Sequence, residues 1–180
     1  MRIAARRLPG SFEVTPEPRG DARGYFMRWY DRDLFAAHGL PTDWRQGNES
    51  GSSRGVVRGL HFQRPPHAES KLVRALRGRV YDVFVDLRRG SPTYGEWDAV
   101  ELDAERHNAV LVPRGCAHGF CVVSEHAVVS YLVDNPYAPH AEGGLAWDDP
   151  ALGIPWPVVG TPILSDKDRA WPRLAALEPL

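Results

Sequence analysis

The sequence predicts an all-β protein, a sandwich or barrel with a few short helices. Short apolar segments follow one another at a spacing of roughly 8–12 residues over most of the chain, which is typical of such folds. The 17 Gly and 16 Pro residues separate these segments and form no single low-complexity run. A chain of 180 residues with 43% hydrophobic residues can bury a substantial core, and its length favours one domain, residues 1–180.

The N-terminal third predicts little regular structure. A short strand is expected around Ile3, and an aromatic strand is expected over Tyr25–Tyr30. Residues 31–38 fit one short helix that Asp31 would cap. The polar, Gly- and Ser-rich stretch 46–54 predicts a loop or an irregular edge.

From Gly55 onward, runs of apolar and β-branched residues predict a series of strands. The Pro-rich tail from Tyr137 predicts loops and short turns that pack over the core. The expected strands cover residues 56–62, 71–76, 80–87, 97–102, 109–113, 120–124 and 127–133.

Composition excludes several classes of function. The formal net charge of −1 gives no overall field that would draw the chain to nucleic acid or to an acidic membrane, so any anionic ligand needs a local cluster of Arg and Lys. Cys116 and Cys121 lie close together on an apolar run, which argues against a disulfide framework and for a reducing cytoplasm. No signal peptide and no apolar span of about 18 residues is visible, so a soluble protein is expected.

Residues 58–71 bring three kinds of functional side chain close together. Arg58 is suited to phosphate, His61 to proton transfer near neutral pH, and Lys71 to a developing oxyanion. In alternating strand register, Arg58 and Leu60 share one face, and His61 and Gln63 share the other. These residue types suit the removal of a proton next to a ketone on a phosphate-bearing sugar.

Other candidates lie further along the chain, each with an ordinary structural alternative. His118 lies on another strand and could converge with His61 on the lumen of a small barrel, although either ring could equally be a satisfied core histidine. Tyr131 could donate a proton opposite a base, or could simply pack with its hydroxyl tied to one partner. Asp168 could orient a base histidine, or could lie in a surface turn, and Lys71 could end its strand in water. The residues alone leave these alternatives open.

A series of short stretches resembles the dTDP-4-dehydrorhamnose 3,5-epimerases, a family of nucleotide-sugar enzymes with the cupin fold, a jelly-roll β-barrel. The resemblance runs from Arg23 to Asp168. Each stretch alone is weakly specific, but their order and spacing together are highly specific. The stretches are DARG (21–24), QGN (46–48), GVVRGLHFQ (55–63), KLVR (71–74), SPT (91–93), AHGF (117–120), WDDP (147–150) and LSDKD (164–168).

The resemblance implies an epimerase that needs no cofactor and no metal. Its substrate would be dTDP-4-dehydro-6-deoxy-D-glucose and its product dTDP-4-dehydro-L-rhamnose, and the ketone at C4 would acidify the hydrogens at C3 and C5. His61 matches the family's base, and Asp168 matches the carboxylate that pairs with it. Lys71 matches the residue beside the enolate oxygen, and Tyr131 matches the acid that returns a proton to the opposite face.

The resemblance also implies a homodimer and a set of substrate contacts. In the family's dimer an N-terminal strand completes the partner's sheet and site, and Tyr25–Tyr30 suits that role because it is too apolar for an open edge. Arg23 and Arg58 match phosphate and nucleotide contacts, and Tyr137 matches the ring that stacks on thymine. Arg28 matches a nucleotide contact at which the family commonly has a glutamate. The remaining matched contacts are Phe26, Gln46, Asn48, His118, Glu142 and Lys167.

Three other functions remain open from the sequence. A metal-dependent cupin could use His61, Glu69 and His118, although Gln63 replaces the second histidine of the usual His-x-His motif. A relative from an antibiotic-sugar pathway could epimerise one carbon only, because ring flipping inside the pocket decides whether the second carbon is reached. A sugar-binding cupin without turnover would lack the base or the acid, and both His61 and Tyr131 are present.

Overall fold

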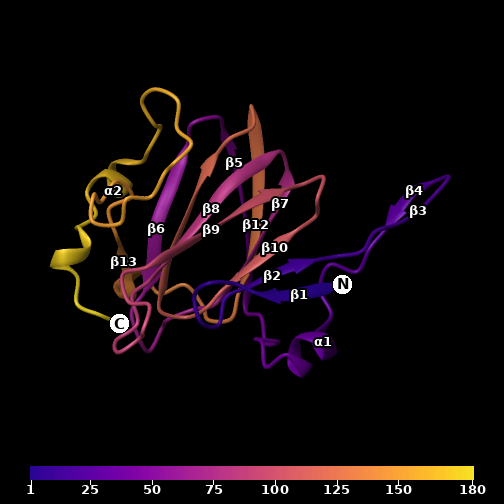
Figure 1. The fold of residues 1–180 in the computed structure, drawn as a ribbon, viewed down its shortest axis with the longest axis horizontal. Helices are drawn as coiled ribbons and strands as arrows, with labels where there is room; N and C mark the ends of the chain where they lie inside the picture. Colours follow the sequence, from indigo (N-terminus) through magenta and orange to yellow (C-terminus); the bar gives the residue numbers. More distant parts are fainter.

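The computed structural model describes residues 1–180, and the body of the molecule is a sandwich of two antiparallel sheets (Figure 1). The all-β jelly-roll prediction is confirmed. The six-stranded sheet has the order β1 (Arg2–Ala5), β2 (Phe12–Thr15), β10 (Ala109–Val112), β7 (Lys71–Arg77), β12 (His126–Val133) and β5 (Gln46–Ser53). The five-stranded sheet has the order β13 (Glu142–Gly144), β6 (Val57–Gln63), β11 (Cys116–Val122), β8 (Arg79–Asp86) and β9 (Trp97–Asp103).

From β5 to β12 the chain crosses between the two sheets at almost every step. Only β8 and β9 follow one another in the same sheet, as an antiparallel pair. Segments that are close in sequence therefore face each other across the sandwich, as β6 and β7 do. This arrangement lets a short motif supply side chains to both walls of one pocket.

The buried apolar residues form three layers. Phe84, Phe120, Val73 and Val110 belong to the cluster between the sheets. A second cluster around Leu60 lies on the outer face of the five-stranded sheet, where the C-terminal tail covers it. The third cluster is centred on the short helix α1 (Arg32–Ala37), which Asp31 caps as expected, and it packs on the outer face of the six-stranded sheet. The tail also contributes the 3-10 helices η1 (Pro139–Ala141) and η2 (Leu174–Ala176) and the helical turn α2 (Asp166–Arg169).

A small hairpin of β3 (Arg19–Asp21) and β4 (Gly24–Phe26) projects from the body near the N-terminus (Figure 1). The aromatic strand expected over Tyr25–Tyr30 therefore ends at Phe26. Trp29 instead lies against the body, with the guanidinium of Arg74 4.7 Å from its ring centre. The expectation of an extended aromatic strand was wrong because packing on the sheet and cation–π contact compete with β pairing.

The stretch 46–54 was expected to be irregular, but β5 is a regular eight-residue edge strand that pairs with β12 along its whole length. Pairing with a well-formed neighbour overrides the low β propensity of its Gly and Ser residues. Strand β11 also begins at Cys116, earlier than the residue 120 expected from the apolar run. Its first half carries small and polar residues that are buried by the neighbouring strands.

A bulge in β6 overturns the strict alternation expected around His61. His118 of β11 pairs with His61 and Phe120 pairs with Arg58, so β6 has one residue more than β11 over this interval. Gly59 absorbs it with φ of 131°, and a Cβ there would lie 2.6 Å from the Cα of Gly119. Arg58 consequently points to the same inner face as His61, whereas Leu60 packs in the outer cluster.

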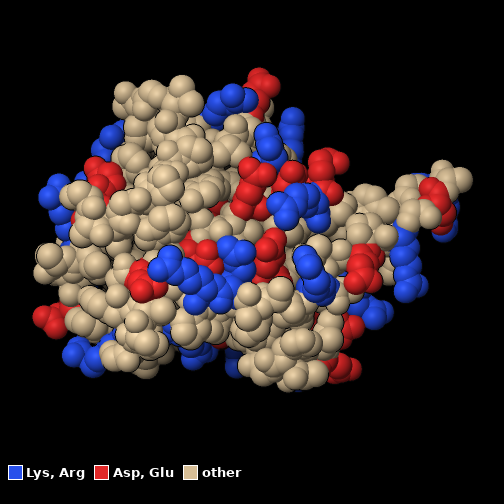
Figure 2. Space-filling view, viewed as in Figure 1, with Lys and Arg blue, Asp and Glu red and all other residues tan.

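Charged side chains of both signs are interspersed over the face shown in Figure 2, without a broad area of one sign. This agrees with the formal net charge of −1. None of the helices has the length and hydropathy needed to cross a membrane.

Candidate active site

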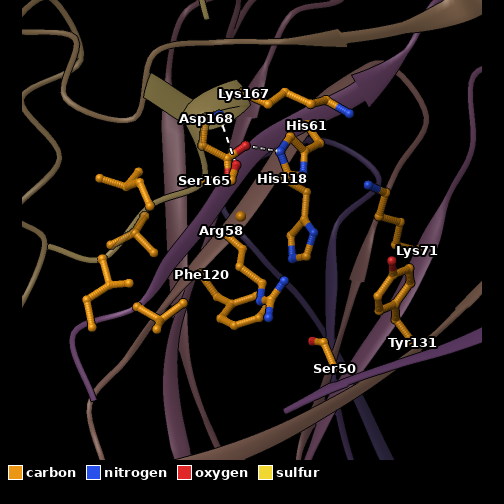
Figure 3. A pocket seen from close by; sticks show the side chains of 15 residues that line it. Ser50, Arg58, His61, Lys71, His118, Phe120, Tyr131, Ser165, Lys167 and Asp168 are labelled. Atoms are coloured by element: carbon orange, nitrogen blue, oxygen red, sulfur yellow. Dashed lines mark hydrogen bonds and ion pairs between the residues drawn. The ribbon is translucent and has the colours of Figure 1, made fainter. Parts of the chain in front are cut away.

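A pocket of about 490 Å³ opens between the two sheets, and half of the site residues predicted from the sequence line it (Figure 3). Its volume is in the range of small-molecule sites. Strands β6 and β11 supply one wall, β7 and β12 supply the opposite wall, and α2 with the segment before it closes one side. The side chains that the sequence predicted and the pocket contains are Arg58, His61, Lys71, His118, Tyr131, Lys167 and Asp168.

His61 is paired with Asp168, as the sequence suggested. The distance from His61 Nε2 to Asp168 Oδ1 is 2.5 Å, and the carboxylate is buried. Ser165 caps α2 by accepting the backbone N–H of Asp168, which fixes the carboxylate in front of the ring. Since Nε2–H donates to the carboxylate, Nδ1 carries the free lone pair and is the basic nitrogen.

Asp168 remains ionised while it holds the imidazole. Burial alone would raise the pKa of this carboxyl, but hydrogen bonds from His61 and from Trp171 lower the pKa below its usual value. A fixed anion behind the ring stabilises the imidazolium that forms when His61 accepts a proton.

A second histidine–carboxylate pair lies directly beside the first. His118 Nε2 is 2.9 Å and 3.0 Å from the two carboxylate oxygens of Asp82, and both side chains are buried. Burial raises the pKa of Asp82, and the neighbouring His118 only partly offsets this effect. Asp82 was missed by sequence reasoning. The one signal in the sequence was a carboxylate inside the apolar run of β8.

Lys71 and Tyr131 stand on the wall opposite the histidines (Figure 3). They lie on neighbouring strands, where Lys71 pairs with Val133 and Tyr131 pairs with Val73. Paired residues and residues two apart on a strand share one face of the sheet, so both side chains point inward. Burial raises the pKa of Tyr131, the charge of Glu69 raises it further, and Arg58 acts in the opposite direction. The phenol is therefore protonated at neutral pH.

The arrangement suits proton transfer at a carbon atom held between the sheets. A basic nitrogen approaches from one wall and a protonated phenol from the other, with an ammonium beside the phenol. Such a geometry can remove a proton from one face of a carbon and return one to the opposite face. The ammonium can stabilise negative charge that develops on an oxygen between them.

A second group of predicted residues lies around Tyr137 and not among the pocket-lining side chains. The Tyr137 hydroxyl donates to Glu142 at 2.9 Å, and its backbone N–H donates to Gln46 at 2.8 Å. Glu142 also pairs with Lys167, which does line the pocket. Hydrogen bonds from Lys167 and Tyr137 outweigh burial and lower the pKa of Glu142.

Four further predicted contacts also lie away from the pocket lining. Arg23 is on the projecting hairpin, where it pairs with Asp21 and its side chain is 89% exposed. Phe26 is 73% exposed on the same hairpin. Arg28 follows the hairpin and pairs with Asp31. Asn48 lies on β5 beside Tyr131, but it is exposed and does not line the pocket.

Several pocket residues had no site role assigned from the sequence. The hydroxyls of Ser50 and Ser165 and the ring of Phe120 line the cavity, together with the apolar side chains of Val56, Val57, Ile163 and Leu164. Small polar and apolar residues of this kind are common everywhere in a chain, so only the fold shows which of them face the pocket.

The ligand set considered for a metal-dependent cupin does not assemble. The Glu69 carboxylate contacts Lys71 and Gln63. The Nε2 atoms of the two pocket histidines are each hydrogen-bonded to an aspartate. No group of three His, Cys, Asp or Glu side chains in the chain converges as metal ligands do.

The fold and the pocket together define a jelly-roll enzyme built for proton transfer at carbon. A family model described as dTDP-4-dehydrorhamnose 3,5-epimerase matches residues 5–176. The dTDP-4-dehydrorhamnose 3,5-epimerase of Methanothermobacter thermautotrophicus is 45% identical over 173 residues, which is 95% of this chain and 93% of that protein. The chain belongs to the dTDP-4-dehydrorhamnose 3,5-epimerase family.

Two further relatives show the range of similarity. The dTDP-4-dehydrorhamnose 3-epimerase of Streptomyces niveus is 47% identical over 170 residues, covering 94% of this chain and 82% of that protein. A structure of the 3,5-epimerase from Legionella pneumophila in complex with dTDP-4-keto-L-rhamnose superimposes with a TM-score of 0.93 at 36% identity, covering 98% of this chain and 94% of that one.

Proposed function

We propose that this protein converts dTDP-4-dehydro-6-deoxy-D-glucose to dTDP-4-dehydro-L-rhamnose by inverting C3 and C5. The observation that carries the proposal is the position of His61 and Tyr131, which line one pocket from opposite sheets. Membership of the family supports the choice of substrate.

In the first step, His61 Nδ1 removes the proton from C3 or C5. The electron pair of the C–H bond moves to the C4 carbonyl oxygen and forms an enolate. Asp168 holds the ring and stabilises its charged form, and Lys71 supplies a positive charge beside the enolate oxygen. Each of these interactions is stronger in the transition state than in the ground state, which is the condition for catalysis.

In the second step, the Tyr131 hydroxyl donates its proton to the opposite face of the same carbon. The enolate electron pair forms the new C–H bond, and the oxygen returns to a ketone. Inversion therefore needs both residues, because a base alone would only exchange the hydrogen. Solvent then removes the proton from the imidazolium and restores the phenol.

The diphosphate and the base would be held by cationic and aromatic side chains near the pocket. Arg58 and Lys167 line it, and Tyr137 lies next to Lys167 through Glu142. Arg23, Phe26 and Arg28 lie on or after the projecting hairpin, so we assign them to the pocket of a partner subunit in a homodimer with exchanged N-terminal segments. Two free, buried cysteines support a cytoplasmic setting.

The test is incubation with dTDP-4-dehydro-6-deoxyglucose in heavy water, followed by NMR. Deuterium at both C3 and C5, with formation of the L-rhamno product, is the expected result. No exchange at either carbon would contradict the proposal. The His61→Ala variant should lose exchange while binding dTDP nearly as well as the wild type, because the ring is not needed to hold the nucleotide.

A second candidate is epimerisation at one carbon only. It is favoured by one observation, the 3-epimerase of Streptomyces niveus, which is as similar to this chain as the 3,5-epimerases are. The same experiment separates the two, since label at C3 alone would identify a 3-epimerase.

A further inference from the structure

Glu69 is a carboxylate that stands behind Lys71 and does not itself line the pocket. Its Oε1 is 3.3 Å from Lys71 Nζ, and the two side chains are only 11% and 10% exposed. The Lys71 side chain therefore lines the pocket, while the Glu69 carboxylate contacts its ammonium from outside the pocket lining. Burial disfavours a charged ammonium, and an adjacent carboxylate counteracts this effect.

The second oxygen of Glu69 is held by a buried amide. Gln63 Nε2 donates to Glu69 Oε2 at 2.6 Å and also contacts the backbone carbonyls of His67 and Pro136. The other end of the amide, Oε1, accepts the backbone N–H of Ala138 at 2.6 Å. Because both carboxylate oxygens have partners and the amide is fixed to two loops, Glu69 has little freedom to move.

The charges around Tyr131 come from several elements. Glu69 precedes β7, which carries Lys71, while Arg58 projects from β6 on the opposite wall. On the same wall as Arg58, His118 lines the cavity and is paired with the buried Asp82, and Lys71 lowers the pKa of Asp82. Among these groups, Glu69 and Arg58 act on Tyr131 in opposite directions, Glu69 raising its pKa and Arg58 lowering it.

We propose that Glu69 is a positioning residue of this site, which fixes the Lys71 ammonium at the pocket wall and places a negative charge near the Tyr131 phenol. The proposal rests on the proposed function and extends it. Glu69 touches neither the substrate nor the reacting atoms. It acts through Lys71, whose ammonium it holds in place, and through Tyr131, whose pKa it raises.

The test is the variant Glu69→Gln, which keeps the size of the side chain and can still accept from Gln63. Loss of the negative charge makes the phenol easier to deprotonate, so the alkaline limb of the pH profile of kcat should move to lower pH by on the order of one unit. At neutral pH, kcat should fall about tenfold or more, because the Lys71 ammonium is no longer fixed at the pocket wall. This loss is smaller than the roughly 10²–10³-fold loss caused by removing an oxyanion donor.

The variant Glu69→Asp keeps the charge and should restore the alkaline limb at least in part, whatever its effect on kcat. Glu101→Gln is the matched control, because Glu101 lies on β9 with its side chain 45% exposed and makes only a long contact to Arg79. An alkaline limb that stays in place in Glu69→Gln, with a loss of thermal stability only, would show a purely structural role and overturn the proposal.

A measurement without substrate keeps this test separate from the assigned reaction. Phenolate absorbance can be titrated in the wild type, in Glu69→Gln and in Tyr131→Phe, and the difference between wild type and Tyr131→Phe isolates this phenol. Its titration should move to lower pH in Glu69→Gln. If the wild type fails to exchange hydrogen but the phenol titration moves, the proposed reaction is wrong and the electrostatic role of Glu69 stands. If the phenol titration does not move, the role of Glu69 is refuted even when the wild type is active.

Discussion

At the scale of single residues, the two histidines of the pocket look alike but their carboxylates differ. Hydrogen bonds from His61 and Trp171 outweigh burial and lower the pKa of Asp168, whereas burial raises the pKa of Asp82, which has His118 as its one hydrogen-bonding partner. A carboxylate that stays ionised stabilises the positive charge that a histidine base acquires when it accepts a proton. We therefore assign the base to His61 and give His118 a binding role.

Replacing Tyr131 by Phe separates exchange from inversion. The variant removes the proton donor and leaves His61 and Asp168 in place. Deuterium should still enter the substrate in heavy water, with retention of configuration, while formation of the epimerised product falls by about 10²–10⁴, the usual contribution of an acid catalyst. NMR of the recovered sugar measures both.

The informative control for this variant is His61→Ala, in which exchange and product formation should disappear together. If Tyr131→Phe forms the inverted product at the wild-type rate, another group donates the proton. In that case the phenol would be a packing residue, the structural alternative that the sequence left open.

The catalytic residues that could be predicted from the sequence are those that match positions of the family that the chain resembles. His61, Lys71, Tyr131 and Asp168 were identified in this way, and the structure brings all four to one pocket. Asp82 was missed because its partner lies 36 residues away on a neighbouring strand, and the sequence does not give strand order. The sequence offers Glu69 only as a possible metal ligand, because its contact with Lys71 depends on the path of the chain into β7.

At the scale of elements, the turn between β8 and β9 explains why the stretch SPT (91–93) accompanies the catalytic motifs. Ser91 and Thr93 each donate a hydroxyl hydrogen bond of 2.6 Å to Oδ2 of the buried Asp86. Arg88 adds a two-pronged contact at 2.7 Å and 2.9 Å and a backbone N–H at 3.0 Å. Burial opposes ionisation of this carboxylate, but these contacts together set the pKa of Asp86 far below its usual value.

Asp86→Asn should destabilise the fold without touching the pocket. It leaves the partly buried Arg88 guanidinium without its counter-ion, which should lower the free energy of unfolding by about 2–4 kcal/mol. The loss is limited because the Arg88 side chain remains partly exposed to solvent. Since the pKa of Asp86 is lower in the folded state, its contribution is complete above about pH 4 and is lost as pH falls further. Urea unfolding at about pH 7 and pH 3 measures both effects.

The difference between wild type and Asp86→Asn should therefore be large at neutral pH and smaller at acid pH. Asp43→Asn is the matched control, because Asp43 is 72% exposed and makes one surface ion pair, with Arg45. A difference that grows as pH falls would mean that the pKa of Asp86 is raised by folding, contrary to its contacts.

Elements were predictable where the chain itself carries a strong pattern. The strands from residue 56 to 133 were placed within a few residues because their apolar runs are bounded by Gly and Pro turns. β5 was not, because its Gly, Ser and Asn residues become a strand only through pairing with β12. The bulge at Gly59 was also invisible, since it depends on the close approach of Gly119 in another strand.

At the scale of the whole molecule, the crossing of the chain between the two sheets creates the site. The hairpin of β3 and β4 projects from the body, and nothing in the single chain accounts for its position. A two-stranded hairpin is marginally stable by itself in water. This one exposes Tyr25 by 61% and Phe26 by 73%, although three residues expected to contact substrate lie on it or just after it. Both facts are accounted for if the hairpin docks on a second copy near that copy's pocket.

Complementation between two inactive variants tests the exchange directly. His61→Ala has an inactive pocket and an intact hairpin, and the double variant Arg23→Ala, Phe26→Ser has an intact pocket and a defective hairpin. In an exchanged dimer, a mixed pair has one pocket with both a functional base and a functional hairpin. Equal mixing after brief exposure to urea should therefore recover about a quarter of wild-type exchange activity, since half of the randomly formed dimers are mixed and each has one active pocket.

Recovery or absence of activity decides whether the hairpins are exchanged, and the mass of the assembly is an independent measurement. If the hairpin served its own pocket, each mixed dimer would contain two defective sites and no activity would return. Mixing His61→Ala with Asp168→Asn should recover nothing in either case, because both changes inactivate the pocket of their own subunit and leave the hairpin intact. In sedimentation, the wild type should have twice the 20.1 kDa mass of the chain, and the hairpin variant should dissociate at higher concentration, because it loses the apolar contact of Phe26.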